Sequence, residues 1–249
     1  MSKQHLLGKR WRKAFKGVIG TEGFVELRTG SEVIASYTSA PFDTQIRCVC
    51  KSCNEGWMEV MERASFPVCE PMAVRNLPTS LDSSAQLALA NWAVETALMM
   101  DRLPASDRYI PQDDYPTFNA LKRPLESHTV WIGRIDPTID LRVVSVIKGI
   151  VRRVALDPND ASIIDKAERS IAAGQWIYLT TFNIGYLVFQ VMGHNLTTGV
   201  ELTTTGGSHG DVMSQVWPYQ GVVEWPPSIS VDAVGGLSVI DNDLRGITA

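Results

Sequence analysis

The stretch of this chain that says most about its fold is Val49-Cys-Lys-Ser-Cys-Asn-Glu-Gly-Trp-Met58. Its Cys50-x-x-Cys53 spacing puts two thiolates on one tight turn, which is half of a tetrahedral zinc site. Cys48 lies just upstream, and three cysteines so close together do not form a framework of disulfides. The stretch therefore predicts either metal ligands or reduced thiols.

A helix is expected directly after this cysteine pair. Asn54 is a residue type that caps helix N-termini, so we expect residues 55–62 to be helical. Pro67 and Pro71 are expected to end that element, because proline lacks a backbone donor and clashes with the preceding turn.

Upstream of the cysteines, residues 5–16 predict a short helix, which the glycines that follow would end. Residues 24–28 and 32–38 alternate apolar and polar positions around residues 29–31. Alternation with a period of two around a Gly-containing turn is typical of a hairpin, so we expect one there.

Downstream, the clearest helix is predicted over residues 84–101, with Ser83 or Ser84 as its cap. Its apolar face, which we interpret as core and not as a cofactor site, comprises Leu87, Ala90, Val94, Ala97 and Leu98. Strands are predicted at 129–135, 141–147, 175–182 and 186–193, and a further helix at 160–173. The sequence thus predicts an α+β fold, with a boundary near residue 80 and helix 84–101 packed between the two halves.

The charge of the chain is uneven. The net charge of −4 and the pI of about 5.6 exclude a strongly basic protein that coats nucleic acid. Residues 1–16 nevertheless hold no acidic side chain and six basic ones: Lys3, Lys9, Arg10, Arg12, Lys13 and Lys16. This run suits phosphate binding with release of counterions, and the alternative is a solvated helix face.

The sequence also bears on the cellular compartment. No segment reaches the roughly 18 unbroken apolar residues of a membrane span, and the N-terminus lacks the apolar stretch of a signal peptide. We therefore expect a cytoplasmic protein whose cysteines are reduced.

The segment 49–58, with Glu62 shortly after it, resembles the C-x-x-C-N-x-G-W-M block of bacterial HNH endonuclease-like proteins. Later segments are similar to later blocks of the same family: 89–97, 128–133, 185–194, 215–218 and 225–227. The resemblance covers most of the chain. It implies a bacterial or phage protein with a small ββα-metal (HNH) nuclease module at residues 1–80, followed by a mixed helix and antiparallel-sheet domain at 81–249.

The resemblance further implies an activity and its residues. A metal-dependent endonuclease would cut DNA with His5 as general base and Asn54 as a ligand of a catalytic Mg²⁺ or Mn²⁺. Cys50 and Cys53 would bind a structural Zn²⁺. DNA phosphates would be held by Lys9, Arg10, Arg12 and Lys13.

Supporting positions differ from the family pattern. Family members carry a first Cys-x-x-Cys pair upstream of a Lys-Glu-His segment, but here that segment is Lys3-Gln4-His5 and follows Met1 closely. A start upstream of Met1 would supply the pair. Gln4 replaces the family's acidic residue and is a weaker ligand for a hard cation. The strand asparagine of many HNH motifs falls near Gln45.

Other candidates carry less chemistry. Cys48 and Cys69 are the remaining thiols, and we expect neither to complete a zinc site. The Gly/Thr-rich segment 203–210 suits a small anion, but it lacks a lysine and a marked helix start, so we expect a loop. Trp217 and Trp225 suit base stacking, but both lie beside prolines, and we expect them to cover the core at the sheet margin.

Three functional hypotheses remain open at this point. The first is a metal-dependent DNA endonuclease. The second is a catalytically inactive HNH remnant that binds nucleic acid or a protein. The third, a small-molecule enzyme in the C-terminal half, lacks paired carboxylates, a phosphate loop and a triad order in the sequence.

Overall fold

The computed structural model describes residues 2–16, 23–29, 32–39, 45–102, 110–136, 146–150, 177–195, 201–202, 207–234 and 247–248. Over these residues the chain is a mixed α+β protein with antiparallel sheets, as the sequence predicts. Among them, no helix has the length and apolar character needed to cross a bilayer. The helix expected at 160–173 and most of the strand expected at 141–147 lie outside the described residues.

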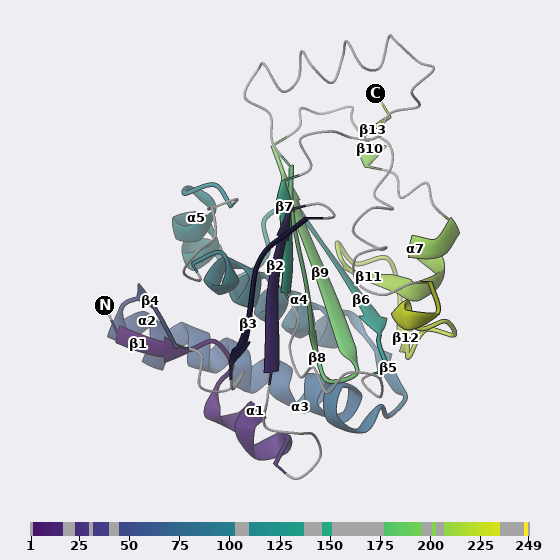
Figure 1. Cartoon of the computed structure of the whole chain (residues 1–249), viewed down its shortest axis with the longest axis horizontal. Coiled ribbons are helices and arrows are strands. Elements are labelled where there is room, and N and C mark those ends of the chain that lie inside the picture. The colour runs from purple at the N-terminus through teal and green to yellow at the C-terminus, as the bar shows by residue number, and fades with distance from the viewer. Residues whose placement is uncertain are drawn as a thin grey trace.

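A five-stranded antiparallel sheet forms the centre of the fold (Figure 1). Its strands lie in the order β11 (Met213–Trp217), β6 (His128–Arg134), β9 (Leu187–His194), β8 (Ile177–Ile184) and β7 (Val146–Ile150). β8 and β9 meet at Gly185, whose φ of +56° favours glycine. A Cβ there would also collide with the carbonyl oxygen of Ala73. This hairpin was predicted, and so was the position of the Pro-flanked β11 at an edge of the sheet.

Four two-stranded antiparallel pairs complete the strands. They are β1 (Ser2–His5) with β4 (Gln45–Val49), β2 (Gly23–Thr29) with β3 (Glu32–Ser39), β5 (Thr79–Leu81) with β12 (Val223–Trp225), and β10 (Glu201–Leu202) with β13 (Ile247–Thr248). The β2–β3 hairpin confirms the expectation for residues 24–38, and β2 lies beside β7 in Figure 1. His5 belongs to β1, so the helix predicted from residue 5 was wrong at its start.

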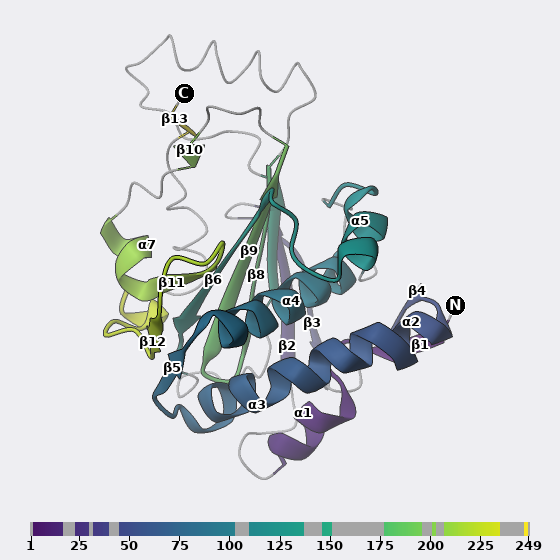
Figure 2. The same cartoon turned by 180° about the vertical axis from the view of Figure 1, so that it is seen from behind.

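The helices lie mostly in the first half of the chain. They are α1 (Lys9–Ala14), α2 (Lys51–Cys53), the π-helical turn η1 (Asn54–Met58), α3 (Glu59–Arg75), α4 (Ser83–Met100), α5 (Asp114–Leu121), α7 (Gly207–Val212) and the short η2 (Val231–Val234). Helices α3 and α4 pack side by side, and α4 crosses one face of the sheet over β6, β9 and β11 (Figure 2). The segment from α2 to α3 follows β4 directly and is a helical run with a kink at Gly56, whose φ of −107° and ψ of −111° are not helical.

Two expectations for this helical run were wrong. Cys50, and not Asn54, is the N-cap, because its Sγ accepts the backbone N–H of Cys53 at 3.2 Å. Pro67 and Pro71 lie inside α3 without ending it. Pro67 is on the exposed side, where water can bond the freed carbonyl, while the opposite side of the helix is buried against α4.

Helix α3 ends instead at Asn76, whose φ of 52° is left-handed. The Asn76 N–H donates to the Met72 carbonyl, and the Leu77 N–H donates to the Pro71 carbonyl. These bonds satisfy carbonyls that the helix end would otherwise leave unpaired.

Helix α4 matches its prediction closely, with a different cap. Asp82, and not a serine, accepts the Ala85 N–H at 2.8 Å. Four of the five predicted face residues are buried, but Leu87 is 37% exposed. The helix is buried over almost its whole second half, from Trp92 to Met100, because it lies between α3 and the sheet.

One connected hydrophobic core joins the N-terminal elements to the sheet. Its centre is aromatic: Trp11 of α1 lies 5.4 Å from Trp92 of α4, and Trp92 lies 5.4 Å from Phe189 of β9, between ring centroids. The core therefore crosses the boundary expected near residue 80. That boundary stays a prediction about domain organisation.

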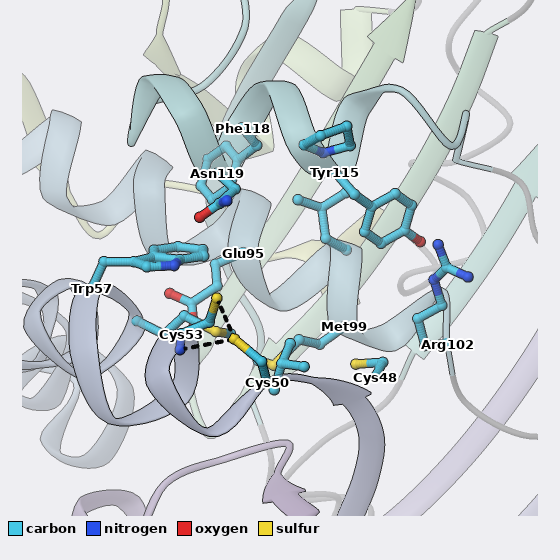
Figure 3. Close-up of a pocket in the computed structure, with 14 residues that line it drawn as sticks. Cys48, Cys50, Cys53, Trp57, Glu95, Met99, Arg102, Tyr115, Phe118 and Asn119 are labelled. Atoms are coloured by element: carbon cyan, nitrogen blue, oxygen red, sulfur yellow. Dashed lines mark hydrogen bonds between the residues drawn. The ribbon is translucent and has the colours of Figure 1, made fainter. Parts of the chain in front are cut away.

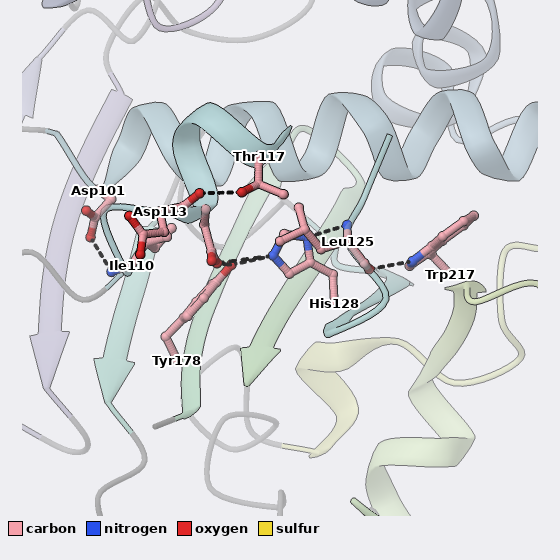
Figure 4. Close-up of polar contacts among 9 residues, drawn as sticks. Asp101, Ile110, Asp113, Thr117, Leu125, His128, Tyr178 and Trp217 are labelled. Carbon is pink, nitrogen blue, oxygen red and sulfur yellow. Dashed lines mark hydrogen bonds and ion pairs between the residues drawn. The ribbon is translucent and has the colours of Figure 1, made fainter. Parts of the chain in front are cut away.

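A buried polar network attaches α5 to the sheet (Figure 4). The Tyr178 hydroxyl of β8 lies 2.9 Å from Nε2 of His128 and 3.3 Å from a carboxylate oxygen of Asp114. Nδ1 of His128 accepts the Leu125 N–H at 3.2 Å. At the same end of α5, the Tyr115 hydroxyl donates to Asp101, which follows α4, at 2.7 Å. These bonds fix the position of α5 over the end of α4.

Replacing Tyr178 with phenylalanine should destabilise the fold. The ring would still pack, but His128 and Asp114 would each lose a buried partner, which costs about 1–3 kcal/mol. The measurement is the free energy of unfolding in urea. Tyr219→Phe is the matched control, because Tyr219 is 48% exposed and should change little. Equal stabilities of the two variants would contradict this role for the network.

Candidate functional site

The turn between β4 and α3 brings three of the predicted residues together. Cys50 ends the extended segment of β4, Cys53 completes α2 one turn later, and Asn54 follows in η1. The Sγ atoms of Cys50 and Cys53 lie 2.8 Å apart, and the Ser52 hydroxyl lies 3.2 Å from Cys50 Sγ. The turn thus concentrates hydrogen bonds on the first sulfur.

These contacts shift the pKa values of the two thiols in opposite directions. The pKa of Cys50 falls to about 7, first because of the hydrogen bond from Cys53 and then because of the one from Ser52. The pKa of Cys53 rises, because its proton is held in the bond to Cys50 and its side chain is partly buried. Cys50 is exposed, so it is the thiol of the pair that supplies a thiolate near neutral pH.

The turn forms one wall of a pocket of about 440 Å³ (Figure 3). The other walls come from the second half of α4 and from α5. Most lining side chains are apolar or aromatic, among them Trp57, Leu98, Met99 and Phe118. This volume lies within the range of about 300–1,000 Å³ that is usual for small-molecule sites.

Among the residues that the structure describes, a single acidic side chain lines this pocket. Glu95 of α4 is only 4% exposed, and none of the described residues hydrogen bonds to its Oε2. Burial raises the pKa of Glu95 well above its ordinary value, and the nearby Glu62 of α3 adds to this rise. An unpaired buried carboxyl group is costly to the fold, which marks Glu95 as a functional candidate.

Two cationic side chains stack on aromatic residues of the pocket, and one of them, Arg102, lines it. The Arg102 guanidinium lies 4.0 Å from the centre of the Tyr115 ring, and it donates to Gln112 at 2.9 Å. Lys122 lies 4.1 Å from the centre of the Trp57 ring. In Figure 3, Trp57, Cys53 and Glu95 gather at one end, while Arg102 and Cys48 lie at the other. The pocket therefore combines an apolar interior with a positive charge at the end where Arg102 lies.

His5 lies apart from the cysteine turn. It pairs with Gln45 at one end of the β1–β4 pair, whereas the turn follows Val49, which pairs with Ser2 at the opposite end. The His5 Nε2 lies 3.4 Å from the Gln45 Nε2, and the His5 side chain is partly exposed. The structure therefore groups His5 with Gln45, and Asn54 with the two cysteines.

The basic residues of α1 are divided between solvent and the fold. Lys9, Arg12 and Lys13 are exposed. Arg10 instead forms a 2.7 Å ion pair with Glu59 of α3, and the bond to Glu59 raises the pKa of the guanidinium. Three of the four predicted phosphate-binding residues thus face solvent beside buried Trp11, which anchors the helix.

The remaining cysteines occupy different environments. Cys48 lines the pocket, where burial raises its pKa and Arg102 opposes that rise. Cys69 is completely buried in α3, and burial raises the pKa of its thiol. All four thiols are free. Within the described part of the chain, no three His, Cys, Asp or Glu side chains surround a common position that suits a metal ion.

Two further expectations are resolved. Trp225 is buried in the core, and Trp217 packs against the core while its Nε1 donates to the Leu125 carbonyl. Both tryptophans therefore cover the core, as expected. The loop expected at 203–210 was wrong for residues 207–210, which form the start of α7, and residues 203–206 lie outside the described residues.

The sequence did not point to the pocket residues that lie outside the cysteine turn. Glu95 is the only charged side chain between residues 84 and 100, a helix whose second half is otherwise apolar or small. That isolated charge was the available signal. The contributions of Arg102, Tyr115 and Asn119 carried no signal, because they depend on how α5 folds back over α4.

The chain matches no model of a known protein family, no curated protein and no solved structure. Its function therefore has to be argued from the site itself.

Proposed function

We propose that the chain is a metal-dependent phosphodiesterase that cuts DNA, built on the unit formed by β1, β4 and the helical run from Lys51. One observation carries the proposal: β1 is antiparallel to β4, and β4 leads without a loop into a helix whose first turn holds Cys50, Cys53 and Asn54. Two antiparallel strands and a following helix are the arrangement that a ββα nuclease requires. The resemblance of residues 49–58 to HNH proteins supports the same conclusion.

In the proposed reaction, His5 accepts a proton from the attacking water. A partly exposed imidazole suits this role, because histidine is the side chain that most often serves as a general base. The amide of Gln45 lies within 3.4 Å of the His5 ring and can hold its orientation. The exposed Lys9, Arg12 and Lys13 would bind the phosphates of the strand.

The metal sites fit the described residues only in part. Cys50 and Cys53 converge and would supply two of the four ligands of a structural Zn²⁺. Asn54 would offer an amide oxygen to a catalytic Mg²⁺ or Mn²⁺, which stabilises developing charge on the phosphoryl group. Neither donor set is complete among the described side chains.

The test is cleavage of supercoiled plasmid by the purified chain with Mg²⁺ or Mn²⁺. We expect His5→Ala to lower the rate by at least about 100-fold, because a general base typically contributes that much. His194→Ala is the matched control, because His194 lies at the far end of β9 and has no role in the proposal. Gln4→Glu should raise the rate, since a carboxylate binds Mg²⁺ better than an amide.

A second candidate function is nucleic-acid binding without cleavage. The specific observation in its favour is the exposure of three basic side chains on α1, together with Gln4 at the position of the family's acid. An intact plasmid in the presence of folded, metal-supplied protein would overturn the nuclease proposal. Salt-dependent DNA binding by that same sample would favour the second candidate.

A further inference from the structure

The pocket between the cysteine turn, α4 and α5 is unexplained by phosphodiester cleavage. His5 does not line it, and Asn54 does not line it either. Its walls are nevertheless built from three separate elements, and α5 is fixed over it by the bonds of Tyr115 and Asp114. Residues from these elements therefore converge on a preformed cavity of about 440 Å³.

We propose that this pocket binds a planar nucleobase that carries a phosphate, with the base inside the apolar interior and the phosphate at a flanking cation. The inference extends the proposed function, since a DNA strand is one source of such a base, and a free mononucleotide is the other. Binding can be measured without cleavage, so the two proposals can fail separately.

The interior suits a flat ring. Trp57, Tyr115 and Phe118 all line the pocket, and the Trp57 and Phe118 rings already meet edge to face at 5.9 Å. Aromatic side chains bind bases by stacking, with little dependence on which base is present. An apolar chain would fill the volume equally well, so the polar groups have to decide the class of ligand.

Glu95 supplies the first polar requirement. Glu95 lines the pocket, and its enclosed Oε2 has no hydrogen-bond partner among the described residues, so the fold leaves hydrogen-bonding capacity unused beside the pocket. A neutral carboxyl group offers one donor and one acceptor side by side. Every nucleobase presents such a donor and acceptor in adjacent positions, so one carboxyl group can make two bonds to any of them. A saturated hydrocarbon ligand would leave Glu95 unpaired.

Arg102 and Lys122 supply the second requirement. Arg102 lines the pocket, and Lys122 lies over the ring of Trp57, which is itself a lining residue. Among the described lining residues, Glu95 is the only one with a carboxyl group. A guanidinium or ammonium group at a pocket end binds a phosphate through charge-assisted hydrogen bonds. A base without a phosphate would use only half of the site.

The experiment is calorimetric titration of the full chain without added Mg²⁺ or Mn²⁺, so that no strand is cleaved during the titration. The ligands are AMP and UMP, with adenosine and ribose 5-phosphate as partial ligands, and a short single-stranded DNA with its duplex. We expect AMP and UMP to bind about equally, and each about tenfold more tightly than either partial ligand. If only the single strand binds, the base comes from a polynucleotide.

Two variants of Glu95 give the matched test. Glu95→Leu keeps the volume and removes the hydrogen bonds, so binding should weaken about tenfold, while the melting temperature should stay the same or rise. Glu95→Gln keeps one donor and one acceptor, so it should bind nearly as the unaltered chain does. Trp57→Leu should also weaken binding, by removing the stacking surface.

Several results would overturn the inference. The first is that no mononucleotide and no single strand binds. The second is that ribose 5-phosphate binds as tightly as AMP and UMP. The third is that the Glu95→Leu and Trp57→Leu variants bind as the unaltered chain does. Plasmid cleavage without Glu95-dependent binding would overturn this inference and leave the nuclease proposal standing. Glu95-dependent binding without plasmid cleavage would leave it standing while the nuclease proposal fails.

Discussion

Trp11→Ala should lower the free energy of unfolding by about 3–5 kcal/mol, the largest loss that we expect from a single side chain. Trp11 is completely buried, and its ring meets Phe15, Phe66 and Trp92 at centroid distances of 6.1, 5.1 and 5.4 Å. These partners come from α3, from α4 and from the residue after α1 itself. Removing the indole would leave a cavity at the point where α1 joins the core.

Urea denaturation followed by far-UV circular dichroism measures this loss. Lys13→Ala is the matched control, because Lys13 lies on the same short helix but is exposed and should change stability little. A Trp11→Ala variant as stable as Lys13→Ala would show that α1 is not held by the core. The basic side chains of α1 would then lack the fixed position that the proposed DNA contact needs.

Glu95→Gln should change how stability depends on pH. Burial raises the pKa of Glu95 in the folded protein, so the folded state keeps a proton that the unfolded chain loses above about pH 4.3. The free energy of unfolding should therefore fall as pH rises from that value towards the raised pKa. The slope for one proton is at most about 1.4 kcal/mol per pH unit.

Glutamine cannot titrate, so the variant should lose this slope and be more stable than the unaltered chain at neutral pH. The comparison is made with the midpoints of urea denaturation, measured at several pH values between about 5 and 7. This window is roughly two pH units wide and lies above the ordinary pKa of glutamate. Glu62 must be tested in parallel with Glu62→Gln, because its pKa is also raised by burial and its charge adds to the rise of the pKa of Glu95. Parallel pH curves for the Glu95→Gln variant and the unaltered chain would contradict the assignment.

The elements that the sequence predicted well are those whose pattern is local. The β2–β3 and β8–β9 hairpins and helix α4 were predicted from alternation and helical periodicity, which depend on neighbouring residues alone. The cap of α4 was missed by one residue because Asp82, Ser83 and Ser84 are all good caps. Which of the three accepts a backbone N–H of the first turn depends on the direction from which the chain enters the helix.

The errors arose where packing opposed a local rule. Pro67 and Pro71 are helix breakers in isolation, yet α3 continues through both because its buried side packs against α4. His5 belongs to a strand because β4, about forty residues later in sequence, pairs with it. A short window of sequence shows neither the packing that offsets the cost of a proline nor the distant strand with which a segment pairs.

The candidate sites divide in the same way. The sequence by itself determined the cysteine turn, since the Cys50-x-x-Cys53 spacing and the helix after it place both thiols and Asn54 within one turn of chain. It also determined the basic character of α1. Only the tertiary structure decided that Arg10 is engaged by Glu59 while three neighbours stay exposed. It alone decided that Glu95, Arg102 and Tyr115 meet the cysteines around one pocket. The physical reason is that a turn is fixed by adjacent backbone geometry, whereas burial and convergence depend on which distant helices the core brings into contact.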